Sequence, residues 1–217
     1  MIGASFLPAV LLIALLVVML WFAFGTQRNI KRGNEVMRWV QTGLPLLGRR
    51  TTLRWLGSSA AQLKLSQALE PFREAEVVVV LEPRDVSVLW AWARAHRRRD
   101  FLILRGELTR APAFELEAGD ARGWTGHDRL RRLDPDLWEE SNWGVEHVSV
   151  RHKPASDSDL ARRFWDQLGE ASGGVWRLSI RQEPPHLEAH VLPPDTAALQ
   201  ADRLFGVFRE LGQKLVE

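Results

Sequence analysis

The sequence has 217 residues, of which 29 are Lys or Arg, 27 are Asp or Glu, and none is Cys. The absence of cysteine excludes a cysteine nucleophile and cysteine-based metal sites, and it fits a reducing compartment. The small net charge of +2 conceals an uneven layout, because residues 28–64 carry a net charge of +7 and residues 65–217 a net charge of −5.

The chain begins with a stretch that has the length and composition of a transmembrane helix. No charged side chain occurs from Met1 to Thr26, and residues 7–24 are almost entirely apolar, with one proline. A helix rises about 1.5 Å per residue, so this stretch nearly crosses the roughly 30 Å hydrocarbon core of a bilayer. We therefore predict that residues 1–25 form a membrane anchor.

A cleaved export signal is the alternative interpretation of the same stretch. Ala23 and Gly25 are small residues at positions −3 and −1 of a candidate cleavage site. However, no basic residue precedes the apolar run, and the run is longer than the about 7–15 residues of a signal-peptide core. A retained anchor is the favoured prediction, and an exported domain with a cleaved signal is the alternative.

The flanking charges predict how the anchor is oriented. Arg28, Lys31 and Arg32 follow the apolar run, whereas no basic side chain precedes it. Positively charged flanks remain on the cytoplasmic side of a membrane. We therefore expect the N-terminus outside and residues 26–217 in the cytoplasm.

Residues 26–50 are predicted to be a basic juxtamembrane segment. Anionic lipids attract such segments by about 1 kcal/mol per basic residue near the surface. Residues 29–42 are expected to form a short helix that lies on or leaves the membrane and ends at Gly43 and Pro45; a solvated linker is the alternative. Nucleic acid is a less expected partner, because the position of these basic residues next to a membrane already accounts for their positive charge. The candidate membrane-surface residues are Arg28, Lys31, Arg32, Arg38, Trp39, Arg49 and Arg50.

Residues 51–217 are predicted to form one α+β domain with a mixed or antiparallel sheet. Residues 51–57 and 60–67 have strand character and form an entry hairpin or edge strands. A β-α-β-β-α pattern then occurs twice, at about 76–133 and 144–215. The expected elements of the first unit are a strand at 76–83, a helix at 85–99 capped by Asp85, a hairpin of 101–108 with 113–118, and a short helix at 125–133. Those of the second unit are a strand at 145–152, a helix at 156–171, a hairpin of 175–181 with 186–192, and a helix at 195–215.

Alternation in the second unit predicts a sheet face that is rich in arginine and histidine. This face is a candidate anion-binding or partner-binding surface, and an ordinary solvated face is the alternative. The sequence HLEAH within it does not predict a metal site, because its acid is at the third position and the stretch alternates like a strand. The candidate residues are His147, Arg151, Arg177, Arg181, His186 and His190.

The helix predicted in the first unit carries two tryptophans, Trp90 and Trp92, about 200° apart around its axis. Trp90 shares a face with Val86, Leu89 and Ala93, which we expect to pack on the sheet. Trp92 is then directed outward and is a candidate partner-binding residue. Packing of Trp92 against the other half of the domain is the alternative.

No motif in the sequence commits the chain to a reaction. It contains no phosphate-binding loop, no dinucleotide-binding turn and no nucleophile elbow, and we expect no cofactor. The favoured function is a single-pass, membrane-anchored interaction module, a subunit or assembly factor of a membrane complex that binds another membrane-associated protein. The alternative is a membrane-tethered enzyme that acts on an anionic or lipid substrate through the Arg/His face.

Overall fold

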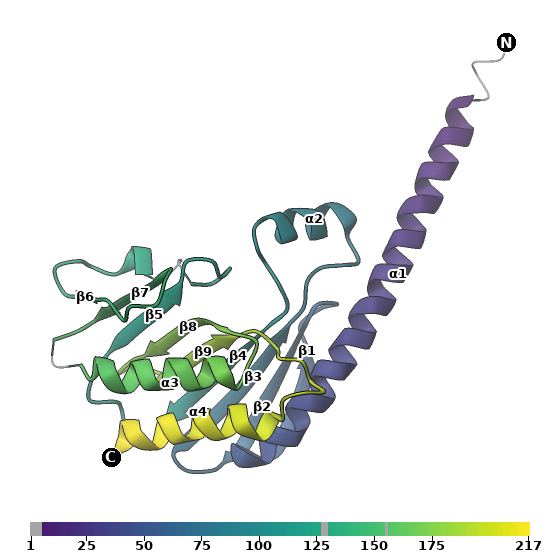
Figure 1. Cartoon of the computed structure of the whole chain (residues 1–217). Helices are drawn as coiled ribbons and strands as arrows, with labels where there is room; N and C mark the ends of the chain where they lie inside the picture. The colour runs from purple at the N-terminus through teal and green to yellow at the C-terminus, as the bar shows by residue number, and fades with distance from the viewer. Residues whose placement is uncertain (1–5, 127–129, 155) are drawn as a thin grey trace.

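The computed structural model describes residues 6–126, 130–154 and 156–217. A long N-terminal helix projects from an α+β domain that is built on one nine-stranded sheet (Figure 1). The helices are α1 (Phe6–Gly43), α2 (Ser87–Ala95), α3 (Ser158–Glu170) and α4 (Ala201–Val216), with short 3-10 helices η1 (Leu44–Leu46) and η2 (Leu130–Arg132). The strands are β1 (Gly48–Trp55), β2 (Ala60–Ala68), β3 (Phe72–Val80), β4 (Phe101–Leu108), β5 (Leu116–Asp120), β6 (Glu139–Ser141), β7 (Val148–His152), β8 (Val175–Ile180) and β9 (Leu187–Val191).

Helix α1 is one continuous helix with two different environments. Its first half is exposed on all sides, and by length and composition it is apolar enough to cross a membrane. Its last turns enter the core of the domain through Val36, Met37 and Val40. The short helix predicted at 29–42 is therefore the continuation of the apolar helix, and it ends at Gly43 as expected.

The sheet is antiparallel throughout, with the strand order β1-β2-β3-β4-β9-β8-β5-β7-β6. The entry hairpin of β1 and β2 lies at one edge, and β8 pairs with β9, as predicted. The predicted hairpin of β4 with β5 is wrong, because β9 and β8 lie between them. Strand β4 pairs with β3 along one edge and with β9 along the other, so it has no free edge with which to pair with β5.

The two predicted units are connected differently, so the predicted repeat is not confirmed. In the first unit, α2 joins the hydrogen-bonded neighbours β3 and β4. In the second, α3 joins β7 to β8, which lie parallel to each other on either side of β5. The first unit ends at η2, and residues 127–129 of the helix expected there lie outside the described residues.

One face of the sheet is covered by α3, α4 and the last turns of α1 (Figure 1). Phe205 and Phe208 of α4 are fully buried, and Phe208 stacks on Phe72 of β3 at 5.4 Å between ring centroids. Helix α3 has the amphipathic face expected of it and is capped by Asp157, whose carboxylate accepts the Leu160 N–H at 2.8 Å. This layer holds the domain together and rigidly connects α1 to it.

Helix α2 does not cover the sheet, which corrects the expectation for the first unit. Asp85 does not cap the helix; its carboxylate accepts a hydrogen bond from Ser58. Val86 and Leu89, expected against the sheet, are exposed, and of the nine α2 residues only Ala93 is buried. Because β3 and β4 are direct neighbours, α2 has only to connect their ends, and it projects beyond the sheet.

Candidate functional site

A row of polar side chains crosses the sheet on the face opposite α3 and α4. The strand registers align one polar residue from each of eight neighbouring strands, and in β2, β3, β9, β8 and β5 the residues on either side of it point into the core. Seven of these eight residues are charged, and charges of opposite sign face each other along most of the row, which favours cross-strand pairing. The row, from β2 to β6, is Lys64, Glu76, Arg105, Glu188, Ser179, Glu117, Arg151 and Glu140.

The two central acids of the row are buried and bind several arginines. Glu117 is 1% exposed and Glu188 is 5% exposed. Arg105 Nε donates to Glu188 Oε2 at 2.7 Å, and Arg177 Nη2 lies 3.1 Å from Glu117 Oε2. Arg181 Nη2 also lies 3.3 Å from Glu188 Oε1. The arginines of this face therefore form ion pairs with buried carboxylates.

His190 extends the network on β9. Its Nε2 lies 3.1 Å from Glu188 Oε1 and its Nδ1 2.8 Å from Thr125 Oγ1, so a neutral ring protonated on Nε2 satisfies both hydrogen bonds. Burial lowers the pKa of His190, and the charges of Arg177 and Arg105 lower it further, against the opposing effect of Glu188. His190 therefore remains neutral at physiological pH.

Glu188 is held in its charged form. Burial alone would raise the pKa of its carboxyl, but hydrogen bonds from His190 and Arg105 and the charge of Arg177 hold this pKa far below its ordinary value. A permanently charged acid beside a neutral histidine is suited to structural ion pairing rather than to proton transfer near pH 7.

The structure brings together most of the predicted Arg/His face. Arg151, Arg177, Arg181 and His190 share it. His186 adjoins it just before β9: its Nδ1 accepts the Leu108 N–H at 2.9 Å, and burial lowers its pKa.

His147 does not belong to this face. It lies in the turn before β7 with a φ of +67° and contacts the neighbouring Glu146.

The candidate residues predicted for this face did not include its acids. Glu117 and Glu188 have the same alternation as the arginines, and this signal could have identified them. A cavity of about 570 Å³ lies over this part of the face. The charged residues that line it include Lys64, Glu76, Arg105, Arg177, Arg181 and Glu188.

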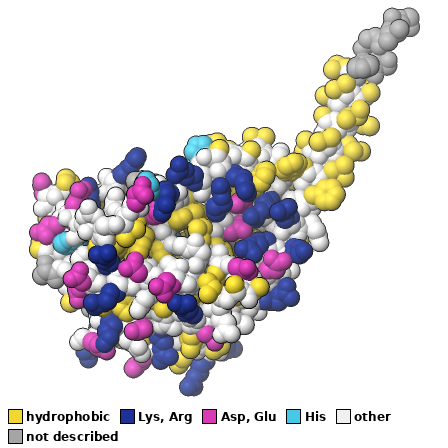
Figure 2. All heavy atoms as spheres, viewed as in Figure 1, with side chains coloured by type: hydrophobic (Ala, Val, Ile, Leu, Met, Phe, Trp, Pro, Cys, Tyr) yellow, Lys and Arg dark blue, Asp and Glu magenta, His cyan; other side chains and the backbone are white. Residues whose placement is uncertain are grey.

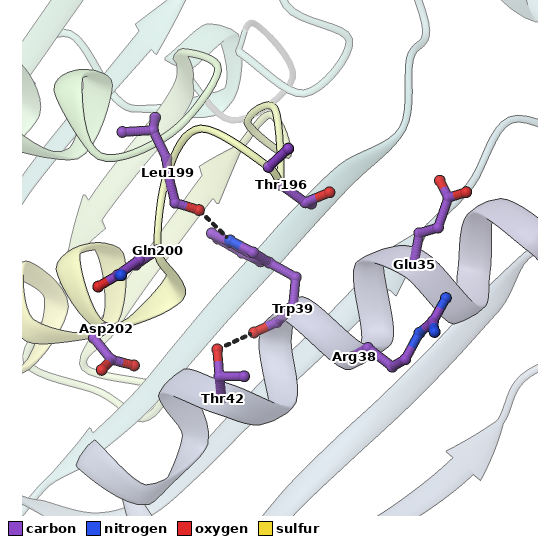
Figure 3. Close-up of a pocket in the computed structure, with 9 residues that line it drawn as sticks. Glu35, Arg38, Trp39, Thr42, Thr196, Leu199, Gln200 and Asp202 are labelled. Atoms are coloured by element: carbon purple, nitrogen blue, oxygen red, sulfur yellow. Dashed lines mark hydrogen bonds between the residues drawn. The ribbon is translucent and has the colours of Figure 1, made fainter.

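Trp39 is a core residue, which corrects its expected place at the membrane surface. It is 7% exposed, and its Nε1–H donates to the Leu199 carbonyl at 2.6 Å. Its ring also packs 6.5 Å from that of Phe205. Figure 3 shows Trp39 directed from α1 toward Leu199, whereas the neighbouring Arg38 points away. The cleft of about 590 Å³ at this contact is therefore a junction between α1 and the segment leading into α4.

The predicted membrane-surface cations are spread along the domain. Arg28 and Lys31 are exposed, and no acid of the described residues lies within ion-pair distance of either. Arg32 instead pairs with Asp100 at 3.4 Å.

Arg49 and Arg50 lie far from the apolar half of α1. They follow Gly48 at the start of β1, beyond Gly43 at the end of α1, and by helix rise Gly43 is about 27 Å from Gly25. If the apolar half crosses a membrane, Arg49 and Arg50 are too distant to touch its surface, which corrects that expectation.

Trp90 and Trp92 have different surroundings. The Trp90 indole N–H donates to the buried Glu82 carboxylate at 2.7 Å, and its ring lies 6.0 Å from that of Trp21 in α1. Trp92 is 49% exposed, and its ring makes an edge contact with Trp124 at 5.7 Å. Trp92 is thus the more exposed of the two, as predicted, although it also contacts a distant segment of the chain.

Strand β1 is an exposed edge of the sheet. Within the described part of the chain it pairs with β2 alone, and seven of its eight residues are exposed. Leu53 and Trp55 present about half of their surface to solvent. Arg50 and Arg54 lie on the other face of the strand, and no described acid pairs with them. This edge combines unpaired backbone groups, apolar side chains and available positive charge.

No protein-family model and no curated protein sequence matches the chain.

Proposed function

We propose that the chain is a single-pass membrane protein whose cytoplasmic α+β domain binds a partner protein close to the membrane, as a subunit or assembly factor of a membrane complex. The observation that carries this proposal is the continuity of α1. Its first half is apolar and exposed, and its second half belongs to the core of the domain. Such a helix holds the domain in a fixed position relative to the membrane.

The packing around Gly25 supports a retained anchor over a cleaved signal. A Cβ atom on Gly25 would lie 2.1 Å from the Arg84 carbonyl oxygen, so only glycine permits this approach. Trp21, one turn earlier, donates its indole N–H to the same oxygen at 3.2 Å. Cleavage after Gly25 would remove both of these contacts with Arg84. Arg28 and Lys31 follow directly and favour a cytoplasmic domain.

The β1 edge is the surface that best fits a partner protein. Exposed edge strands pair with extended segments of other chains, through backbone hydrogen bonds and alternating side-chain contacts. Arg50 and Arg54 favour an acidic segment, and Leu53 and Trp55 offer apolar contacts on the other face of the strand. The half-exposed Trp92 is a second candidate contact.

A membrane-tethered enzyme acting on an anionic or lipid substrate is the second candidate. The cavity beside Arg105, Arg177 and Arg181 favours it. We rank it second because these arginines form ion pairs with Glu117 and Glu188, which compete with an anionic substrate.

The partner-binding proposal is tested by purification of the tagged full chain from its own host in mild detergent. We expect a stoichiometric partner that the double variant Arg50→Glu/Arg54→Glu loses, because the reversed charges repel an acidic segment. The matched control is Arg162→Glu/Arg163→Glu, two exposed arginines of α3, and it should retain the partner. Trp92→Ala, run in parallel, reports on the second contact. Equal retention by both double variants would refute the role of β1.

A further inference from the structure

A cleft separates α1 from α2 on the side of the domain from which α1 projects. Its volume is about 490 Å³. Helix α1 forms one wall, and the other is formed by α2 and the segment leading into it. The lining residues are Trp21, Phe24, Gly25, Arg28, Arg84, Trp90 and Arg94.

The walls of the cleft are held in place by specific contacts. The Trp21 and Trp90 rings meet at 6.0 Å with an interplanar angle of 49°. Both indole N–H groups have acceptors, since Trp21 donates to the Arg84 carbonyl at 3.2 Å and Trp90 to Glu82 at 2.7 Å. The two rings therefore present a fixed apolar surface to the cleft.

The cleft has an excess of positive charge. Arg84 is bound to Asp100 at 3.0 Å, and Arg94 lies 3.4 Å from Glu82. Arg28 is exposed, and the described residues place no acid within ion-pair distance of it. The three guanidinium groups thus face two buried acids, and Arg28 remains available for an external anion.

The cleft lies at the depth of lipid headgroups if α1 spans the bilayer, so the inference rests on the proposed membrane anchor. Residues 7–24 rise about 27 Å, close to the thickness of a hydrocarbon core, which places Trp21 and Arg28 at its cytoplasmic boundary. Trp90 contacts Trp21 and therefore lies at the same level. Next to it, Val88 is 79% exposed and Leu89 is half-exposed.

The surface around the cleft has the layering of a membrane contact. Figure 2 shows hydrophobic side chains on the rim of the domain beside the projecting helix, with Lys and Arg side chains just beneath them. Tryptophan is favoured in the headgroup layer, and guanidinium groups bind phosphate through paired hydrogen bonds. Indoles, exposed aliphatic residues and an available arginine thus coincide at one depth.

We propose that the cleft between α1 and α2 binds the phosphate of an acidic membrane phospholipid. Arg28 contacts the phosphate, and the half-exposed Arg94, which keeps its contact with Glu82, adds positive charge beside it. Trp21 and Phe24 contact the start of the acyl chains. Helix α2 lies in the interfacial layer of the bilayer and is a second membrane contact of the domain.

The test measures binding of a short-chain phosphatidylglycerol to the full chain in uncharged detergent, by tryptophan fluorescence or native mass spectrometry. We expect Arg28→Gln/Arg94→Gln to weaken binding about tenfold or more, because charge-assisted hydrogen bonds are lost. The matched control is Lys31→Gln/Arg97→Gln, which removes two exposed cations of the same region outside the cleft. It should change the affinity less than about threefold. The single variant Arg28→Gln, which breaks no described ion pair, should weaken binding without affecting stability.

Three results would overturn the site. These are equal losses in the two double variants, equal affinity for short-chain phosphatidylcholine, and binding of inorganic phosphate as tight as that of the lipid. Alkaline carbonate extraction of native membranes separates this inference from the proposed function. A chain released by carbonate refutes the anchor, whereas a chain that resists carbonate but fails the lipid test refutes the cleft alone.

Discussion

At the scale of single residues, Glu188 organises the most densely charged part of the molecule. Its carboxylate lies 2.7 Å from Arg105, 3.4 Å from Arg177 and 3.1 Å from His190. Removing one member of a buried ionic network leaves the remaining charges without compensation. Replacing any one member of this network with a neutral residue should therefore destabilise the fold, because the remaining buried charges then lack part of their counter-charge.

Glu188→Gln should lower the free energy of unfolding by about 3–5 kcal/mol, because a neutral amide removes the buried negative charge that Arg105, Arg177 and Arg181 share. Glu74→Gln is the matched control, since Glu74 pairs with Lys64 at 2.8 Å on an exposed surface. It should change stability by about 0–1 kcal/mol. Urea unfolding of the full chain in detergent, followed by tryptophan fluorescence, measures both. Similar effects of the two substitutions would show that the row of charges is not a buried network.

At the scale of elements, α1 combines two kinds of helix in one. Its apolar half has no polar face, whereas its second half buries Val36, Val40 and Trp39 against the domain. At its end, a Cβ on Gly43 would lie 2.3 Å from the ring of Phe205, so glycine is needed where α1 meets α4. The junction is a packed interface and not a flexible linker.

Trp39→Ala should therefore reduce stability by about 3–5 kcal/mol, as expected for a large buried aromatic residue. Arg38→Ala is the control at the adjacent, exposed position and should change stability by no more than about 0.5 kcal/mol. The same urea titration distinguishes the two. If Trp39→Ala left stability unchanged but weakened binding to vesicles, the original expectation of a membrane-surface role would be restored.

At the scale of the whole molecule, the charge of the chain is unevenly distributed along the sequence. The basic residues Arg28 and Lys31 follow the apolar half of α1, residues 28–64 carry a net charge of +7, and residues 65–217 carry a net charge of −5. The flank of a single transmembrane helix that carries the excess of positive charge remains on the cytoplasmic side of the membrane.

A reporter that is active only in the cytoplasm, fused after residue 217, should be active. Replacing Arg28, Lys31 and Arg32 with glutamate should reduce this activity, because the charge bias that sets the orientation is reversed. A reporter that is active only outside the cytoplasm serves as the complementary control. Its activity at the same position, or a mature chain that starts at Thr26, would exclude the anchored cytoplasmic arrangement.

Local patterns determined the elements of this protein. The apolar run predicted the long helix, alternation predicted which residues of β8 and β9 share a face, and the pattern of residues 156–171 predicted α3. These features depend on residues that are close in sequence, because helix and strand periodicities arise from backbone geometry alone. Helical spacing likewise predicted that Trp90 and Trp92 point in different directions, but not what covers each of them, since the face with Val86 and Leu89 that was expected on the sheet is exposed.

The tertiary structure decided how these elements combine. Insertion of β9 and β8 between β4 and β5 depends on hydrogen bonds between strands distant in sequence, which no local pattern specifies. That insertion places Glu188 beside Arg105 and Glu117 beside Arg177, so a face that looked cationic in sequence became internally neutralised. Burial of Trp39 and exposure of α2 have the same cause. Each depends on which distant surface is present to cover a side chain, and only the folded chain determines that.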